Sequence, residues 1–299
     1  MMSKQPNINT QVNCYPLIYA SGHNGEQEKL PTVVNEQLAV VSDLIATHHL
    51  PIKLDYQPSN IKLSQKNRQK LSEQYQQPLL IIDEKGQLSL LIEGMSVAPN
   101  WASLQRRIVS AGRKSELLLQ ASKLTSESTV IDATAGFGHD SLILASGGAS
   151  VSMLEQQPVL ALLLLAEQQK MAKEKNWQKL MARLNIVCIE ASDYLALKST
   201  QKVDVVYLDP MFPDDSYENS QTGKGAKVGK HMQALHGLVA PPNLQVQRQL
   251  LDNALSVLKQ GGRVVVKRPV NAPNFAEQMA DESWQNAVIR FDGYFARGI

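Results

Sequence analysis

Residues 209–213, Asp-Pro-Met-Phe-Pro, combine types that can present an amine for alkylation. An exocyclic amino group on a base is a poor nucleophile because its lone pair is delocalised into the ring. The Asp209 carboxylate and the Pro210 carbonyl could accept its two N–H bonds and leave the lone pair free to attack. Phe212 would stack on the base and hold it in place. We expect these three residues to be catalytic; the alternative is an ordinary Asp-Pro turn after a strand.

A second motif, at residues 129–140, is typical of a buried strand, a Gly-x-Gly turn and the start of a helix. Such a turn presents backbone N–H groups and the positive end of the helix dipole to a ligand. A dinucleotide fingerprint would need a third glycine, which is missing after Gly136 and Gly138, and Asp132 precedes the turn. The motif therefore favours S-adenosylmethionine, with S-adenosylhomocysteine as product, over NAD. A plain structural turn is the alternative.

Acidic residues follow the next two predicted strands. Glu155 comes at the end of the second strand, where its carboxylate can accept hydrogen bonds from both ribose hydroxyls of an adenosine. A surface glutamate that opens the next helix is the alternative. After the third strand, Ser192 and Asp193 could bind the adenine edge, unless Asp193 only caps the short helix at Tyr194.

The elements that position these residues alternate along the second part of the chain. Strands are expected at residues 130–132, 150–154, 185–189, 203–208 and 263–267. Helices are expected at about 139–146, 158–176 and 243–259, the last ended by Gly261-Gly262 as a C-cap. Residues 287–291 and 294–297 are expected to form a hairpin around Asp292-Gly293. The pattern predicts an α/β fold: a Rossmann-like parallel sheet closed by an antiparallel hairpin, as in methyltransferases.

The chain is expected to hold two domains. Residues 1–100 are predicted to form a small α/β domain, with a strand at 14–20, helices at 35–48 and 64–77, and a hairpin of 79–83 with 88–92. A change to Pro, Asn, Ser and basic residues predicts a linker at 101–114. The methyltransferase-like domain would then cover 115–299, and its first helix would cover 115–124. No chemistry is indicated in the first domain, whose role the sequence leaves open.

Composition is that of an ordinary globular protein, with 299 residues and 43% hydrophobic residues. The N-terminus lacks the apolar core of a signal peptide and no apolar run could span a bilayer, so we expect a cytoplasmic protein without a membrane partner. Cys14 and Cys188 lack metal-ligand spacing, and His23, His48 and His49 lack matching carboxylates, which predicts neither a disulfide nor a metal site. The net charge of +2 permits a nucleic-acid partner without requiring one.

Basic residues surround the expected base pocket. A long polar segment from residue 214 to residue 242 follows the Asp-Pro motif, as a lid or substrate-binding loop would. Lys267 and Arg268 come at the end of the fifth strand, on the sheet edge that also carries Asp209. We expect these cations to neutralise RNA phosphates. The predicted phosphate contacts are Lys224, Lys227, Lys230, Lys267 and Arg268.

From about residue 110 onward the chain resembles the bacterial small-subunit ribosomal RNA guanine-N2 methyltransferases of the RsmJ type. The resemblance is carried by four blocks: Asp132-Ala-Thr-Ala-Gly-Phe-Gly-His-Asp140, Met153-Leu-Glu155, Val206-Tyr-Leu-Asp-Pro-Met-Phe-Pro213 and Val264-Val-Val-Lys-Arg-Pro269. It implies cofactor contacts at seven positions, namely His139, Asp140, Glu155, Gln156, Ser192, Asp193 and Asp209.

These observations predict an enzyme that transfers a methyl group from S-adenosylmethionine to the N2 amine of a guanosine in 16S ribosomal RNA, as free RNA or in the small ribosomal subunit. A DNA adenine or cytosine amino-methyltransferase is the alternative enzyme, because the Asp-Pro-x-Phe pattern alone would permit it. A non-catalytic RNA-binding module is the alternative outside enzymes.

Overall fold

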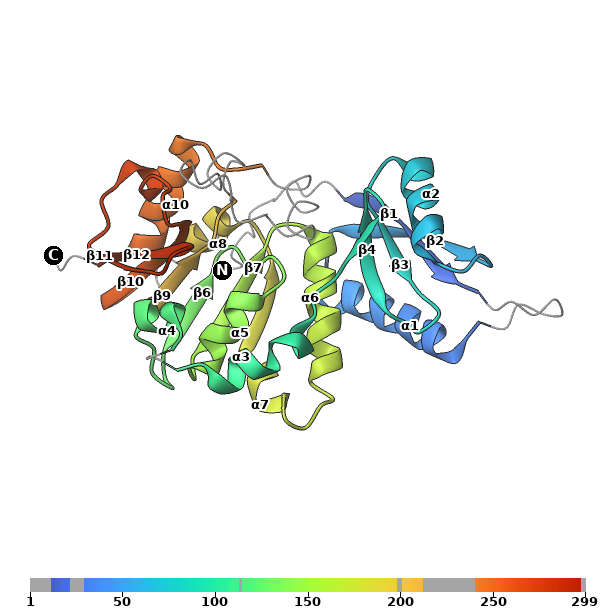
Figure 1. The fold of residues 1–299 in the computed structure, drawn as a ribbon, viewed down its shortest axis with the longest axis horizontal. Coiled ribbons are helices and arrows are strands. Elements are labelled where there is room, and N and C mark those ends of the chain that lie inside the picture. The colour runs from blue at the N-terminus through green and yellow to red at the C-terminus, as the bar shows by residue number, and fades with distance from the viewer. Residues whose placement is uncertain (1–11, 22–29, 113–114, 198–200, 212–239, 297–299) are drawn as a thin grey trace, which may run out of the picture. The chain divides into compact units, whose positions relative to one another are not determined.

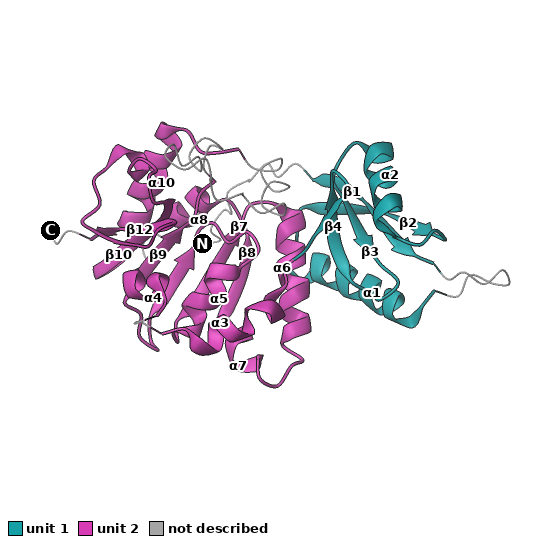
Figure 2. Ribbon diagram, in the orientation of Figure 1, with its two compact units in different colours: residues 1–98 teal, residues 99–299 magenta. Residues whose placement is uncertain are grey.

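The computed structural model of the chain describes residues 12–21, 30–112, 115–197, 201–211 and 240–296 (Figure 1). The chain divides into two compact units, Met1–Ala98 and Pro99–Ile299 (Figure 2). The predicted linker at 101–114 instead begins with two short helices of the second unit, η1 (Trp101–Leu104) and α3 (Gln105–Ser110). The side chain of Trp101 is fully buried, so this part of the segment is folded.

The N-terminal unit is a five-stranded sheet in the order β2-β1-β3-β4-β5. Its elements are β1 (Asn13–Ala20), α1 (Thr32–Thr47), β2 (Ile52–Ser59), α2 (Gln65–Tyr75), β3 (Leu79–Ile82), β4 (Leu88–Ile92) and β5 (Met95–Val97). The predicted hairpin is confirmed as β3 and β4, with Asp83 accepting hydrogen bonds from the Lys85 and Gln87 amides across the turn. The edge strand β2 is not predicted because it has a polar composition and only Ile52 is buried.

The C-terminal unit is a seven-stranded sheet in the order β11-β12-β10-β9-β6-β7-β8. Its strands are β6 (Thr129–Asp132), β7 (Ser150–Glu155), β8 (Leu184–Cys188), β9 (Val203–Leu208), β10 (Leu258–Pro269), β11 (Glu282–Gln285) and β12 (Ile289–Phe295). Strands β6 to β10 are mutually parallel where they pair, and β12 runs antiparallel to both β10 and β11. The predicted α/β fold with an antiparallel closing hairpin is therefore confirmed.

Helices connect and cover these strands (Figure 1). They are α4 (Leu117–Ser122), α5 (His139–Ser146), α6 (Pro158–Met171), α7 (Gln178–Met181), α8 (Ala191–Leu197), α10 (Leu244–Ser256) and the 3-10 turn η3 (Phe275–Glu277). The predicted helix at 139–146 is confirmed residue for residue. Two others end early: α6 ends at Met171 and α10 at Ser256, before the predicted Asn176 and Lys259.

Two glycine pairs have roles other than those predicted. Gly261-Gly262 does not cap a helix but lies in β10, where the register with β9 shifts; a Cβ on Gly262 would be 2.9 Å from two backbone oxygens. Asp292-Gly293 is not a turn but lies in the middle of β12. The closing hairpin turns instead at residues 286–288, where Asn286 accepts hydrogen bonds from the following amides.

Side-chain alternation in β9 and β10 determines which residues can meet α5. Val206, Leu208 and Val266 belong to a core cluster with residues of α8 and α10 on one face of the sheet. Because successive side chains of a strand point to opposite faces, Tyr207 and Lys267 lie on the other face. That face is the one covered by α5, as the contacts described below show.

Candidate active site

The glycine turn between β6 and α5 has the conformation that its sequence predicts. Gly136 and Gly138 have φ angles of +53° and +74°, which L side chains rarely adopt. A Cβ on Gly138 would come within 2.6 Å of Met153, so the turn is closely packed on that side. At Gly136 the nearest atom to such a Cβ is the Thr134 carbonyl oxygen at 3.9 Å, so backbone is accessible there. The turn can therefore admit a ligand beside Gly136.

Asp132 ties this turn to α5 from the end of β6. Its side chain is 1% exposed, and it accepts hydrogen bonds from the Ser141 hydroxyl and, at 3.1 Å, from the Thr134 amide. Burial raises the pKa of Asp132 to about 7, although both hydrogen bonds oppose the shift. The buried carboxylate thus holds the turn and the start of α5 together through these two hydrogen bonds.

Glu155 is the last residue of β7, the strand beside β6. It is 6% exposed and accepts the Gly136 amide at 3.1 Å and the Gln157 amide at 2.8 Å. Burial raises the pKa of Glu155 to about 7, and the nearby Asp132 adds to the shift. Glu155 therefore ends its strand, as predicted, and its carboxylate is hydrogen-bonded to the glycine turn.

A cluster of charges joins β9, β10 and α5 at the same sheet edge. The Lys267 ammonium lies 2.8 Å from Asp140 Oδ2 and 2.9 Å from Asp209 Oδ2. The Tyr207 hydroxyl donates to Asp140 Oδ2 at 2.7 Å. The Asp209 amide donates to Thr134 Oγ1 at 2.6 Å, which connects the end of β9 to the glycine turn. Lys267 therefore brings together Asp140 and Asp209, both of which the family resemblance implies as cofactor contacts.

The two carboxylates of this cluster have opposite pKa shifts. Burial raises the pKa of Asp209, and the Lys267 charge only partly offsets it. For Asp140 burial acts the same way, but the charge and hydrogen bond of Lys267, together with the Tyr207 hydroxyl, leave its pKa below the ordinary value. Despite burial, the two carboxylates raise the pKa of Lys267, so its ammonium stays charged.

The chain is similar to known methyltransferases. Residues 52–296 match the family model described as "Putative SAM-dependent methyltransferase". The ribosomal RNA small subunit methyltransferase J of Psychrobacter cryohalolentis is 59% identical over 270 residues, 87% of this chain and 91% of that protein. The chain belongs to the ribosomal RNA small subunit methyltransferase J family.

More distant relatives are also methyltransferases. The methyltransferase J of Acinetobacter baylyi is 39% identical over 219 residues, 72% of this chain and 80% of that protein. The crystal structure of a SAM-dependent methyltransferase from Neisseria gonorrhoeae superposes with a TM-score of 0.64 at 27% identity, covering 95% of this chain and 97% of that one. The cofactor of this methyltransferase family is S-adenosylmethionine.

The residues at the glycine turn suit that cofactor. S-adenosylmethionine carries ribose hydroxyls and an ammonium, which donate hydrogen bonds, so its site needs acceptors. Glu155 supplies a buried carboxylate that accepts the Gly136 amide, and the main causes of its pKa shift are burial, backbone hydrogen bonds and the charge of Asp132. A buried carboxylate with that surrounding is suited to accept hydroxyl groups. Glu155 is therefore a candidate acceptor for the ribose hydroxyls of this cofactor.

The other predicted cofactor residues lie near this edge with different surroundings. His139 and Gln156 are exposed, at the start of α5 and after β7. Ser192 and Asp193 lie in the first turn of α8, and Asp193 is exposed. The alternative for Asp193 as the helix cap is wrong, because Glu190 accepts the Asp193 amide at 3.0 Å and so caps the helix itself.

Arg268 is not placed for the predicted contact with RNA phosphate. Its side chain is 5% exposed, donates a hydrogen bond to the Pro273 carbonyl and lies over the Phe275 ring. Alternation along β10 directs it to the face opposite Lys267. Phe212 and the predicted phosphate contacts Lys224, Lys227 and Lys230 lie outside the described residues.

Three contributors to the site of this methyltransferase are missed by sequence reasoning. Thr134 and Tyr207 hold Asp209 and Asp140, as described above. Trp101 donates its indole N–H to the Phe137 carbonyl at 2.7 Å and its amide to Glu167 at 3.2 Å, supporting the glycine turn. Only Tyr207 has a detectable sequence feature, since it is a hydroxyl-bearing residue in an otherwise apolar part of β9.

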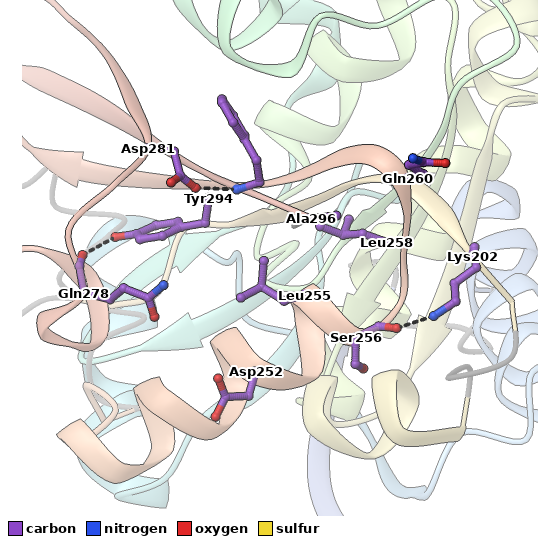
Figure 3. A pocket seen from close by; sticks show the side chains of 11 residues that line it. Lys202, Asp252, Leu255, Ser256, Leu258, Gln260, Gln278, Asp281, Tyr294 and Ala296 are labelled. Atoms are coloured by element: carbon purple, nitrogen blue, oxygen red, sulfur yellow. Dashed lines mark hydrogen bonds between the residues drawn. The ribbon is translucent and has the colours of Figure 1, made fainter. Parts of the chain in front are cut away.

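A groove of about 740 Å³ lies at the opposite edge of the sheet (Figure 3). It is lined by residues before or at the starts of β9 and β10, such as Lys202 and Leu258, and by Tyr294 near the end of the antiparallel β12. Ligands of open parallel sheets bind at the carboxyl ends of the strands, where Asp132, Glu155 and Asp209 lie. The groove is therefore not the cofactor site.

In the part of the chain that the structure describes, no three His, Cys, Asp or Glu side chains are grouped so that they could hold a metal ion. None of the helices described there has the length and apolar composition needed to cross a membrane.

Proposed function

We propose that this chain methylates the exocyclic N2 amine of a guanosine in small-subunit ribosomal RNA. The observation that carries the proposal is the position of Asp209. This residue directly follows β9, its backbone is held by Thr134, and it lies at the strand edge that also bears Glu155. The names and identities of the relatives support ribosomal RNA as the substrate.

Each residue has a defined task in this proposal. Glu155 and the backbone at Gly136 bind the adenosine part of S-adenosylmethionine, which when bound supplies an electrophilic methyl group. Asp209 and the Pro210 carbonyl accept the two N–H bonds of the guanine amine and orient its lone pair. A strong general base is not needed, because the amine proton becomes acidic once the nitrogen is methylated.

The electrostatics of the cluster support an amine in this position. Asp140 and Asp209 carry two negative charges, and Lys267 carries one positive charge. The cluster therefore has one negative charge in excess when both carboxyls are ionised. Such a charge stabilises the positive charge that develops on the amine during alkylation.

The test is transfer of label from S-adenosylmethionine to small ribosomal subunits, to free 16S ribosomal RNA and to duplex DNA. We expect label in one or both RNA substrates and none in DNA. Nucleoside analysis of ribosomal RNA from a deletion strain should then show the loss of one N2-methylguanosine. Label in DNA alone would contradict the proposal, and cofactor binding without transfer to any substrate would favour a binding module.

A further inference from the structure

We propose that Lys267 is a positioning residue, which holds the Asp209 carboxylate ionised and oriented by bridging it to Asp140, instead of a phosphate contact. This inference rests on the proposed function, since it assigns Asp209 the task of aligning the amine. From the sequence alone, this lysine is instead expected to contact an RNA phosphate.

The geometry of the bridge fixes one oxygen of Asp209. The backbone of this residue is anchored by Thr134 Oγ1 at 2.6 Å, and its Oδ2 atom is held by the Lys267 ammonium at 2.9 Å. The other oxygen, Oδ1, has no hydrogen-bond partner among the residues that the structure describes. Lys267 therefore sets the orientation of the carboxylate and leaves one oxygen to accept an amine N–H.

The bridge is itself held from three elements. Pairing of Val266 with Leu208 puts Lys267 beside the end of β9. Asp140, in the first turn of α5, takes both the Lys267 ammonium at 2.8 Å and the Tyr207 hydroxyl at 2.7 Å on a single oxygen. The lysine side chain is 26% exposed, so it makes these contacts in a largely buried setting where ion pairs are less screened than at the surface.

Lys267 is poorly suited to bind a phosphate. Two carboxylates already lie within 3 Å of its ammonium, and when both are ionised the three groups together carry one excess negative charge. A phosphate approaching Lys267 would be repelled by Asp140 and Asp209. The same excess charge attracts the partly positive N–H hydrogens of the guanine amine, so the surroundings of Lys267 match the positioning role.

Other ionisable groups around Lys267 affect the same titration. They are Asp132 on β6, His139 on α5, Tyr207 on β9 and Arg107 on α3. On β12, Arg290 and Asp292 pair with each other, and alternation places them on the opposite face, because Phe291 is the residue opposite Lys267. These groups stay the same when only Lys267 is changed. A difference in the acid limb between the wild type and a Lys267 variant can therefore be assigned to the lysine.

The experiment compares Lys267→Gln with Lys259→Gln, a matched control. Lys259 is on the same strand and lies 2.8 Å from Asp204 of β9, but at the other edge of the sheet. Single-turnover methyl transfer is measured against pH at saturating RNA and cofactor, and RNA affinity is measured against salt. Thermal unfolding of each variant establishes that it is folded.

Lys267→Gln should lower the transfer rate at pH 7 by at least about tenfold, with the logarithmic salt dependence of RNA binding unchanged. Because the Lys267 charge lowers the Asp209 pKa, its removal should raise that pKa and move the acid limb of the rate profile to higher pH. Lys259→Gln should leave rate, acid limb and salt dependence at wild-type values. Lys267→Arg should keep the wild-type acid limb because the positive charge remains. Its methyl transfer should be slower, since a planar guanidinium does not have the geometry of an ammonium that bridges two carboxylates.

Two results would overturn the inference. One is a Lys267→Gln variant with the wild-type rate and acid limb, and the other is a salt slope reduced by about 0.7 to 0.9, as for a lost phosphate contact. If Lys267→Gln does not fold, Lys267→Arg decides, because a phosphate contact would give it the wild-type rate. If wild-type protein methylates no RNA, the proposed function fails instead; a ¹³C titration of the Asp209 carboxyl with and without the Lys267 charge then tests the bridge directly.

Discussion

Strands β9 and β10 make a lysine–aspartate contact at each end of their pairing. At the carboxyl edge, Lys267 lies between Asp209 and Asp140 with its side chain 26% exposed. At the amino edge, Lys259 contacts Asp204, and these side chains are 43% and 33% exposed. The distances are nearly equal, so distance alone does not distinguish the two contacts.

Burial and neighbours are what differ. Burial raises the pKa of Asp209, whereas Lys259 and the Thr129 hydrogen bonds lower the pKa of Asp204 despite partial burial. The amino edge also has the groove of Figure 3, yet the carboxyl edge has the buried acceptors. A groove provides space for a ligand, whereas buried ionisable groups with shifted pKa values are typical of functional sites.

The largest expected effect is at the carboxyl edge, in Asp209→Ala. Removing the acceptor that aligns the amine should lower single-turnover methyl transfer on the order of a hundredfold, as for loss of one preorganised polar group. The measurement is made at saturating cofactor, so that any loss of cofactor affinity does not contribute. Asp204→Ala is the control and should keep the wild-type rate in its folded fraction. Equal rates in wild type and Asp209→Ala would show that the amine-aligning mechanism is wrong.

Glu155→Gln should have the next largest effect, on cofactor binding. Losing a charged acceptor costs about 1.5–3 kcal/mol, so calorimetry should show S-adenosylmethionine bound roughly tenfold or more weakly. The wild-type affinity should also fall by about tenfold from pH 8 to pH 6, because the Glu155 pKa of about 7 leaves the carboxyl mostly protonated at the lower pH. The variant should lose most of this dependence. An unchanged dissociation constant would exclude Glu155 as the ribose acceptor.

The sequence is sufficient to predict the backbone of the site because local rules determine it. Gly136 and Gly138 sit between a strand and a helix, and the carboxyl ends of parallel strands meet at one edge, which brings Asp132, Glu155 and Asp209 together. The partners of Lys267 cannot be predicted in this way. They depend on which face of β10 is covered by α5, and tertiary packing determines that.

The errors at the end of the chain have the same origin. Asp292-Gly293 is a strong local hairpin pattern, but Asp292 is fully buried and accepts hydrogen bonds from Arg290 and Ser283. Gly293 leaves room for Trp284, which a Cβ would approach to 2.9 Å. Tertiary contacts thus override the turn propensity, and the chain turns at Asn286 instead.

Trp101→Phe should have a moderate effect on the carboxyl edge. The change keeps an aromatic ring but removes the donor to the Phe137 carbonyl, which should cost about 1–3 kcal/mol of unfolding free energy and weaken cofactor binding a few-fold by loosening the turn. Trp177→Phe is the matched control, because Trp177 is also buried but precedes α7. The control should lose stability without losing cofactor affinity. Equal cofactor affinities in the two variants would contradict a supporting role for Trp101.

The smallest effect is expected at the amino edge, from the Lys259–Asp204 contact itself. Since both side chains are about a third exposed or more, a double-mutant cycle with Lys259→Met and Asp204→Asn should give a coupling of only about 0.2–1 kcal/mol. The folded-state pKa of Asp204 is lowered, so its stabilising contribution is present at neutral pH and should disappear as the pH falls through that value. Urea unfolding at pH 7 and at acidic pH measures both quantities. A coupling of several kcal/mol, or one that persists in acid, would contradict a weak, solvent-screened contact at the amino edge.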